Sequence, residues 1–239
     1  MGMPIMRLKN IQFHNVTPEV KKYFLLDKKD LMAKPKVSYK TNNVILTNVL
    51  ILGNQGTGKT TTVNSIANMF VKKYGRENVN CVMSDTGDLE MLLEGGFKDK
   101  LINIVFADNI TSEKINDSTL KEYFRCRKIL NDEYDRYNGH IITFFGVHRY
   151  HSSPKELRAN ESALIVRDST AYGYDRNLLI RRIGEKNVKI FDAFERARLK
   201  NRALFKYSYF CSKTINGWMS LSMPKEYMFT YPDITLFEK

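Results

Sequence analysis

The feature that most restricts how this chain can fold is a glycine-rich turn between an apolar strand and an amphipathic helix. Residues 53–60 read Gly-Asn-Gln-Gly-Thr-Gly-Lys-Thr, and they follow the apolar stretch 44–52. Residues 60–74 continue with apolar side chains at helical spacing. A buried strand that leads through a tight turn into a helix is typical of a parallel α/β sheet.

The spacing within this turn is that of a P-loop, which binds phosphates. Glycines leave the backbone N–H groups unobstructed, and the N-terminus of the next helix adds partial positive charge. Lys59 supplies a charge for the β- and γ-phosphates, and the Thr60 hydroxyl is a hard ligand suited to Mg²⁺. The predicted ATP-binding residues are Gly53, Asn54, Gln55, Gly56, Thr57, Gly58, Lys59, Thr60 and Thr61.

Hydrolysis of ATP by such a site needs a second carboxylate directed at Mg²⁺ from the end of a buried strand. Asp108 follows the apolar stretch 101–107, and Asp85 follows the stretch 79–84. We favour Asp108 because of the elements that come after it. Each acid also has a plainer interpretation as a helix cap or a turn residue.

Strand and helix patterns alternate along the rest of the chain, which together with the P-loop predicts an α/β P-loop NTPase fold. We expect a mainly parallel central sheet flanked by helices, with a C-terminal β-hairpin. The expected strands are 44–52, 79–84, 101–107, 140–147 and 163–167. The expected helices are 60–74, 88–93, 118–137, 154–160 and 175–183.

The two ends of the chain differ from this alternating core. Residues 1–43 contain three prolines and a basic stretch, and we predict an N-terminal extension with a short helix at 18–26. Residues 44–239 form the predicted P-loop ATPase domain. Its hairpin joins 203–212 to 218–222 across Asn216-Gly217, a strong turn signal.

Charge and hydropathy narrow the environment of the protein. The net charge of +12 attracts polyanions such as nucleic acid or an anionic membrane surface, or it simply maintains solubility. No apolar run reaches the roughly 18 residues that span a bilayer. The three cysteines form no closely spaced pair, which is typical of a reducing compartment. We therefore expect no membrane span and a cytoplasmic location.

The order of motifs after Asp108 resembles that of the FtsK/HerA family of DNA-pumping ATPases, including the genome-packaging ATPases of archaeal and other membrane-containing viruses. A long polar helix precedes a strand that ends in Thr-Phe-Phe-Gly-Val-His-Arg at 143–149. A segment that begins with Pro154, the strand 163–167 and a helix start at Asp175 follow. The resemblance extends over residues 44–223, and it implies that the P-loop NTPase fold is of the RecA/ASCE-like kind.

This resemblance implies that ATP hydrolysis drives translocation of double-stranded DNA, and that viral genomic DNA is packaged into the virion. It assigns catalytic roles to Lys59 and Asp108, with Thr60 and Asp108 holding Mg²⁺. His148 stands at the sensor Gln position, and Arg149 follows it. The implied partners are DNA, further copies in a ring such as a hexamer, and capsid or portal proteins. The implied location is the host cytoplasm, with association to the virion.

Three departures from the family pattern leave parts of the site open. Asn109 takes the place of the usual catalytic Glu, and an amide is a poor proton acceptor. Glu113, Asp85 or a neighbouring subunit are the candidate substitutes. His148 replaces Gln but can still hydrogen-bond the γ-phosphate or water. The candidates for an arginine acting on a neighbour's site are Arg149, Arg158, Arg167 and Arg176, each of which is alternatively a solvated or salt-bridged side chain.

Two other function classes fit parts of the sequence. A small-molecule kinase would use an arginine-rich lid, for which 181–202 is the candidate segment. A nucleotide-gated assembly protein would bind ATP and hydrolyse it weakly, as Asn109 favours.

Overall fold

The computed structural model describes residues 24, 45–133, 137, 139–168, 174–200, 205, 207–213, 216–220 and 235–236. The predicted helix at 18–26 lies outside these residues except for Phe24, which is helical and fully buried. Its ring lies 6.3 Å from that of Phe144 and 5.7 Å from that of Phe210. At least this part of the extension therefore packs into the core.

The described part of the chain forms an eight-stranded sheet with the order β7-β6-β5-β1-β4-β3-β2-β8. The pairs between β5 and β8 along this order are parallel, and β6 pairs antiparallel with both β5 and β7. The strands are β1 Ile45–Leu52, β2 Val79–Ser84, β3 Ile102–Ala107, β4 His140–Val147, β5 Ala163–Val166, β6 Tyr207–Ser212, β7 Asn216–Ser220 and β8 Thr235–Leu236. The prediction of a mainly parallel α/β fold is confirmed.

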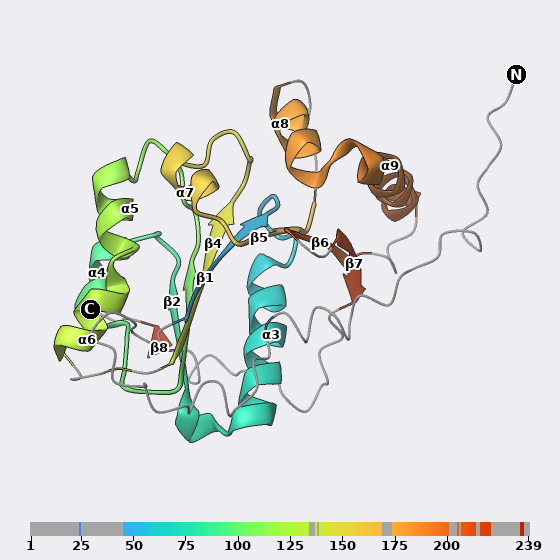
Figure 1. Cartoon of the computed structure of the whole chain (residues 1–239). Coiled ribbons are helices and arrows are strands. Elements are labelled where there is room, and N and C mark those ends of the chain that lie inside the picture. The colour runs from blue at the N-terminus through green and yellow to red at the C-terminus, as the bar shows by residue number, and fades with distance from the viewer. Residues whose placement is uncertain are drawn as a thin grey trace, which may run out of the picture.

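Helices cover both faces of this sheet (Figure 1). Alternate residues of β1 show the arrangement, since Val49 and Ile51 pack with α3 while Leu50 and Leu52 pack with helices of the other face. Residues of β1 to β6 contribute to the buried apolar clusters on both faces of the sheet, so these strands are buried from two sides. The helical segments are α3 Lys59–Tyr74, η2 Arg76–Asn78, α4 Leu89–Gly95, α5 Asp117–Tyr123, α6 Cys126–Glu133, α7 Lys155–Ala159, α8 Tyr174–Ile183 and α9 Glu185–Lys200.

The strand order has a direct consequence for the site. β4 lies between β1 and β3 and is parallel to both. The segments that follow the carboxyl ends of these three strands are therefore neighbours. They lie at the end of the sheet where α/β proteins bind ligands. They carry the P-loop, His148 and Asp108.

The predicted helix at 118–137 is wrong in its extent. α5 ends at Tyr123 and α6 begins at Cys126, because the amide of Arg125 bonds back three residues to the Glu122 carbonyl and breaks the regular ladder. The N-cap of α5 is Asn116, whose side chain accepts from the Thr119 amide at 2.8 Å, so this helix begins at Asp117.

The C-terminal hairpin is confirmed as β6 and β7, but its predicted turn is wrong. Asn216 and Gly217 lie inside β7, paired with Cys211 and Phe210. Pairing of β6 with β5 extends the sheet, and this extension overrides the local turn preference of the Asn-Gly pair. No helix in the described part of the chain is long and apolar enough to cross a bilayer.

Candidate functional site

A cavity of about 460 Å³ opens at the carboxyl ends of the parallel strands. It lies between the P-loop, the start of α3 and the segments after β3 and β4. Its lining residues are Asn54, Gln55, Gly56, Gly58, Lys59, Thr60, Thr61, Asp108, Asn109 and His148. Most of the predicted ATP-binding residues therefore surround a single space.

The P-loop holds a backbone conformation that its glycines allow. Gly56 and Gly58 have φ values of 76° and 87°, in the left-handed region. Gly58 is also the N-cap of α3, and a Cβ there would lie 3.1 Å from the Arg167 guanidinium. The first backbone amides of α3 therefore lie at the cavity wall. They have no partners within the helix, so they can donate to phosphate oxygens.

Two predicted loop residues, Gly53 and Thr57, are not among the lining residues. The Gly53 amide donates to the Val147 carbonyl at 3.0 Å, and the Thr57 hydroxyl donates to the Asn54 carbonyl at 2.8 Å. Both residues hold the loop in shape. Their direct contact with a nucleotide stays a prediction.

Lys59 extends back across the P-loop. Its side chain is only 5% exposed, and Nζ donates to the Gly53 carbonyl at 3.0 Å. The same Nζ lies 3.7 Å from Asp108 Oδ1. A single cation therefore sits between the loop and the acid, where phosphates would enter.

Asp108 reaches the cavity directly after β3. Its Oδ1 accepts from the Asn109 amide at 2.9 Å, and it lies so close to Gly146 that a Cβ at that position would overlap it. Sequence reasoning missed Gly146, although a glycine within an apolar strand signals such a close approach. Asp85, the alternative acid, has an exposed side chain outside the cavity lining. Glu113 is likewise exposed and outside it.

His148 follows β4 and faces Asn109. Its Nε2 lies 2.9 Å from Asn109 Oδ1, and Asn109 Nδ2 donates to the Asp85 carbonyl at 2.8 Å. Partial burial lowers the pKa of His148, and the nearby Lys59 ammonium lowers it further, while the Asp108 carboxylate opposes the shift. A lowered pKa favours the neutral imidazole, which can accept a hydrogen bond.

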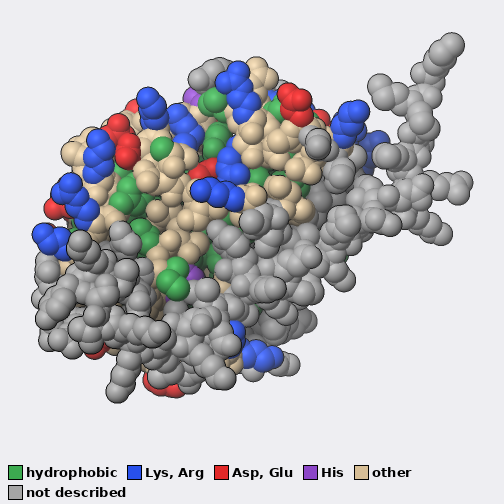
Figure 2. All heavy atoms as spheres, in the orientation of Figure 1, with side chains coloured by type: hydrophobic (Ala, Val, Ile, Leu, Met, Phe, Trp, Pro, Cys, Tyr) green, Lys and Arg blue, Asp and Glu red, His purple; other side chains and the backbone are tan. Residues whose placement is uncertain are grey.

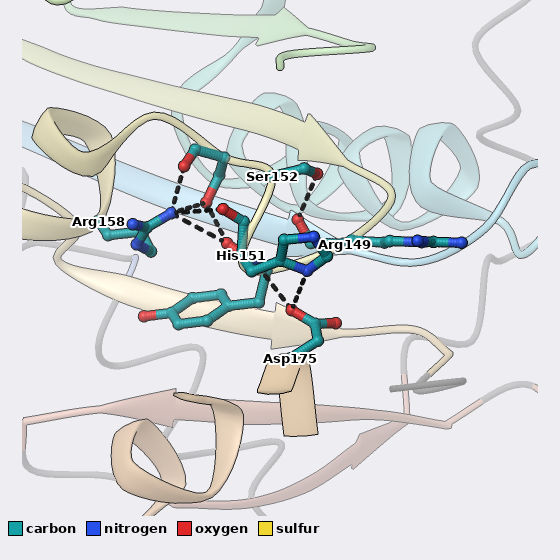
Figure 3. A network of polar contacts seen from close by, with 7 residues as sticks. Arg149, His151, Ser152, Arg158 and Asp175 are labelled. Atoms are coloured by element: carbon teal, nitrogen blue, oxygen red, sulfur yellow. Dashed lines mark hydrogen bonds and ion pairs between the residues drawn. The ribbon is translucent and has the colours of Figure 1, made fainter. Parts of the chain in front are cut away.

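The segment after His148 is held by side chains from two helices (Figure 3). Arg158 donates to the carbonyls of Tyr150, His151 and Ser153. Asp175, at the start of α8, accepts from the His151 amide at 2.6 Å and lies 3.2 Å from His151 Nδ1. These contacts fix the backbone on which His148 and Arg149 are carried.

The four candidate arginines differ in what they contact. Arg167 is buried and donates to the carbonyls of Thr57 and Phe205 and to the Ser208 hydroxyl. Arg158 binds the loop carbonyls, and Arg176 pairs with Asp192 at 2.6 Å. The guanidinium of Arg149 is exposed, extends away from the network in Figure 3, and has no partner among the described residues.

The predicted Mg²⁺ ligands fit the requirements of that ion. The side chains of Thr60 and Asp108 line the same cavity next to Lys59. A hydroxyl and a carboxylate are hard oxygen donors of the kind that Mg²⁺ takes together with phosphates and water. Bound there, Mg²⁺ would neutralise charge on the phosphates; the roles of both residues stay predictions.

Comparison with known proteins gives one family match. Residues 49–166 match the model of the "ATPase family associated with various cellular activities (AAA)". This range contains every residue that lines the cavity.

Other comparisons add little to this match. No curated protein matches the sequence significantly. Among solved structures, the chain is similar to the monomer form of the pCW3 conjugation coupling protein TcpA with ATPgS, at 13% sequence identity and a TM-score of 0.36. The alignment covers 75% of this chain and 60% of that chain, so this chain spans less than two thirds of its neighbour. A likeness this loose carries no argument about function.

Proposed function

We propose, from the premise that residues 49–166 are a P-loop ATPase domain of the AAA type, that this chain hydrolyses ATP and uses the energy to move double-stranded DNA. One observation supports hydrolysis above all others. One cavity at the N-terminus of α3 is lined by Lys59, Asp108 and His148. These residues follow the three neighbouring strands β1, β3 and β4 along the chain.

Each of these groups has a role in this proposal. The backbone amides of the P-loop and the first turn of α3 bind the phosphates, and Lys59 neutralises charge that develops on the γ-phosphate. Thr60 and Asp108 hold Mg²⁺. His148 lines the same cavity as the P-loop and reaches the γ-phosphate or the attacking water.

The proposal that DNA is the track depends on charge. The chain carries +12, and Lys and Arg side chains are spread over the face shown in Figure 2. Lys121 in α5, Arg125 between the two helices and Lys128 in α6 are exposed and form a short basic row along the chain. Such a row can contact successive backbone phosphates without reading the bases.

We further propose that a second copy of the chain completes the site. Within the described residues, no arginine lines the cavity. Arg149 is exposed and has no partner among the described residues. It follows the lining residue His148 directly, on a segment that Arg158 and Asp175 hold in place. A neighbouring subunit in a ring would place this guanidinium against the γ-phosphate, where an arginine contributes about 10³-fold or more to turnover.

The test of the DNA proposal is ATP turnover with and without duplex DNA. We expect stimulation that falls as salt rises, because phosphate contacts release counterions. A variant with Lys121, Arg125 and Lys128 changed to Glu should lose the stimulation and keep basal turnover. The matched control reverses three exposed charges elsewhere, Lys72 and Lys73 at the far end of α3 and Arg76 in η2. Equal stimulation in both variants would remove α5 and α6 from the DNA surface, and a lack of stimulation in the wild type would contradict translocation.

The test of Arg149 is a mixture of two inactive variants. Lys59→Ala lacks the phosphate cation but supplies Arg149, and Arg149→Ala has the opposite defect. If Arg149 acts on its neighbour, mixing restores part of the turnover. If the mixture stays inactive while sizing with ATP shows mixed assemblies, Arg149 does not act between subunits.

The two alternative classes fare differently. The segment proposed as a kinase lid packs on the sheet at Phe191, which is buried with its ring 5.1 Å from that of Tyr209. None of the described residues of this segment, 181–200, lines the cavity. A weakly hydrolysing assembly protein is tested by single-turnover hydrolysis. Equal rates in the wild type and Lys59→Ala, with ATP binding retained, would favour it over a DNA motor.

The viral part of the hypothesis stays a prediction. It comprises the packaging of viral DNA, the capsid or portal partners, and the location in host cytoplasm or virion.

A further inference from the structure

Asn109 holds an unusual backbone conformation at the wall of the cavity. Its φ of 61° is the one positive value among the described residues other than glycine. Asparagine tolerates this left-handed region better than most residues, and a residue held there beside a ligand site points to a function. The conformation turns the side chain of Asn109 toward His148.

The amide of Asn109 bridges two segments. Its Nδ2 donates to the Asp85 carbonyl at 2.8 Å, so the nitrogen of the amide is oriented by a group that only accepts. Oδ1 then faces His148 Nε2 at 2.9 Å. Because Oδ1 also only accepts, His148 Nε2 must carry the hydrogen. In the neutral ring, Nδ1 is left as the acceptor.

We propose that Asn109 is a positioning residue that fixes the orientation and tautomer of His148, so that His148 Nδ1 accepts a hydrogen bond from the water that attacks the γ-phosphate. This inference rests on the proposed ATP hydrolysis. It gives Asn109 a task that an amide can perform, where a proton acceptor was expected. Asp108, the acid among the lining residues, lies beside Lys59 and is committed to the proposed Mg²⁺.

A double-mutant cycle tests whether Asn109 acts through His148. Asn109→Gly keeps the left-handed backbone and removes only the amide. We expect kcat to fall about 10-fold with the affinity for ATP little changed, because the bridge orients the water and not the nucleotide. In a His148→Ala background, the same change should have no further effect. Additive effects would overturn the proposal.

The control for this cycle is Glu113→Gln. Glu113 is an exposed acid near Asn109 in sequence but outside the cavity lining, so this variant should keep the wild-type turnover. A large loss in Glu113→Gln, with a normal Asn109→Gly, would identify a different group and reject the bridge.

A spectroscopic readout separates this inference from the proposed function. Nitrogen-15 correlation spectra of the histidine rings at about pH 8, above the usual histidine pKa, report which ring nitrogen carries hydrogen. His148, assigned with His148→Gln, should be protonated on Nε2 in the wild type and mixed in Asn109→Gly. A wild-type ring protonated on Nδ1 would reject the bridge even if ATP is hydrolysed. A correct tautomer in a protein that hydrolyses no ATP would instead reject the proposed function alone.

Discussion

The two ends of the central sheet both carry polar side chains, but they use them in opposite ways. At the carboxyl end, Lys59, Asp108 and His148 line an open cavity. At the amino end, Asn103 is fully buried, and its amide donates to the Tyr137 hydroxyl at 2.7 Å and accepts from Asn80 Nδ2 at 2.9 Å. One end leaves its polar groups for a ligand, and the other satisfies them within the protein.

This difference separates function from stability within one sheet. A buried polar network stabilises only while each member keeps its partner, so losing one residue leaves several groups unsatisfied. A polar group at an open cavity can be solvated by water when it loses a partner. Substitutions at the carboxyl end should therefore reduce activity, and substitutions at the amino end should reduce the free energy of unfolding.

The largest expected effect is on activity, from Lys59→Ala at the carboxyl end. Loss of the cation that faces the phosphates should lower kcat by about 100-fold or more. The free energy of unfolding should change by less than about 1 kcal/mol. Steady-state ATP turnover and urea denaturation measure the two quantities. Strong destabilisation by Lys59→Ala would break the division between the two ends.

The second effect is on stability, from Asn103→Ala at the amino end. It removes one partner each of Asn80 and Tyr137 and the acceptor of the Lys98 amide, and it should lower the free energy of unfolding by about 3 kcal/mol. ATP turnover per folded molecule should stay near the wild-type value. The control is Asn116→Ala at the exposed cap of α5, which should cost about 1 kcal/mol. Turnover that falls in step with stability would show that the ends are coupled.

The smallest expected effect is a pH dependence that originates at His140. Burial lowers the pKa of His140 from 6.5 to about 4, and Nε2 lies 2.7 Å from the Thr47 hydroxyl. Between these pKa values the unfolded chain binds a proton that the folded chain does not, so stability falls as the pH falls. From pH 7 to pH 5 the wild type should lose about 2 kcal/mol more than His140→Gln. Denaturation of both proteins at these pH values measures it, and parallel losses would exclude His140 as the source.

The sequence predicted the carboxyl end better than the amino end, for a physical reason. The turn at 53–60 has a fixed spacing because phosphates impose it, and strands 79–84 and 140–147 are apolar runs with clear limits. Asp108 and His148 came within the set of predicted site residues because each follows such a strand. In the structure both residues line one cavity, because the strands that precede them are neighbours in the sheet.

Contacts between residues far apart in the chain could not be predicted. Asn103 and Tyr137 are 34 residues apart, and nothing local marks them as partners. Arg167 looked like a candidate for a neighbour's site, but it is used within its own chain to join the P-loop to the segment before β6. Asn109 was interpreted as a missing base, since its left-handed backbone and its bridge to His148 exist only in the folded chain.

The buried ring of Phe24 has a practical consequence for anyone who shortens this protein. Trimming at the expected boundary after residue 43 would remove a side chain that packs against Phe144 of β4 and Phe210 of β6. A void the size of a phenylalanine ring costs about 3–5 kcal/mol, which is a large part of the margin of an ordinary domain. A truncated version would be prone to poor expression and aggregation, and its inactivity would say nothing about the catalytic groups. Shortened variants made for purification or crystallisation should therefore retain Phe24.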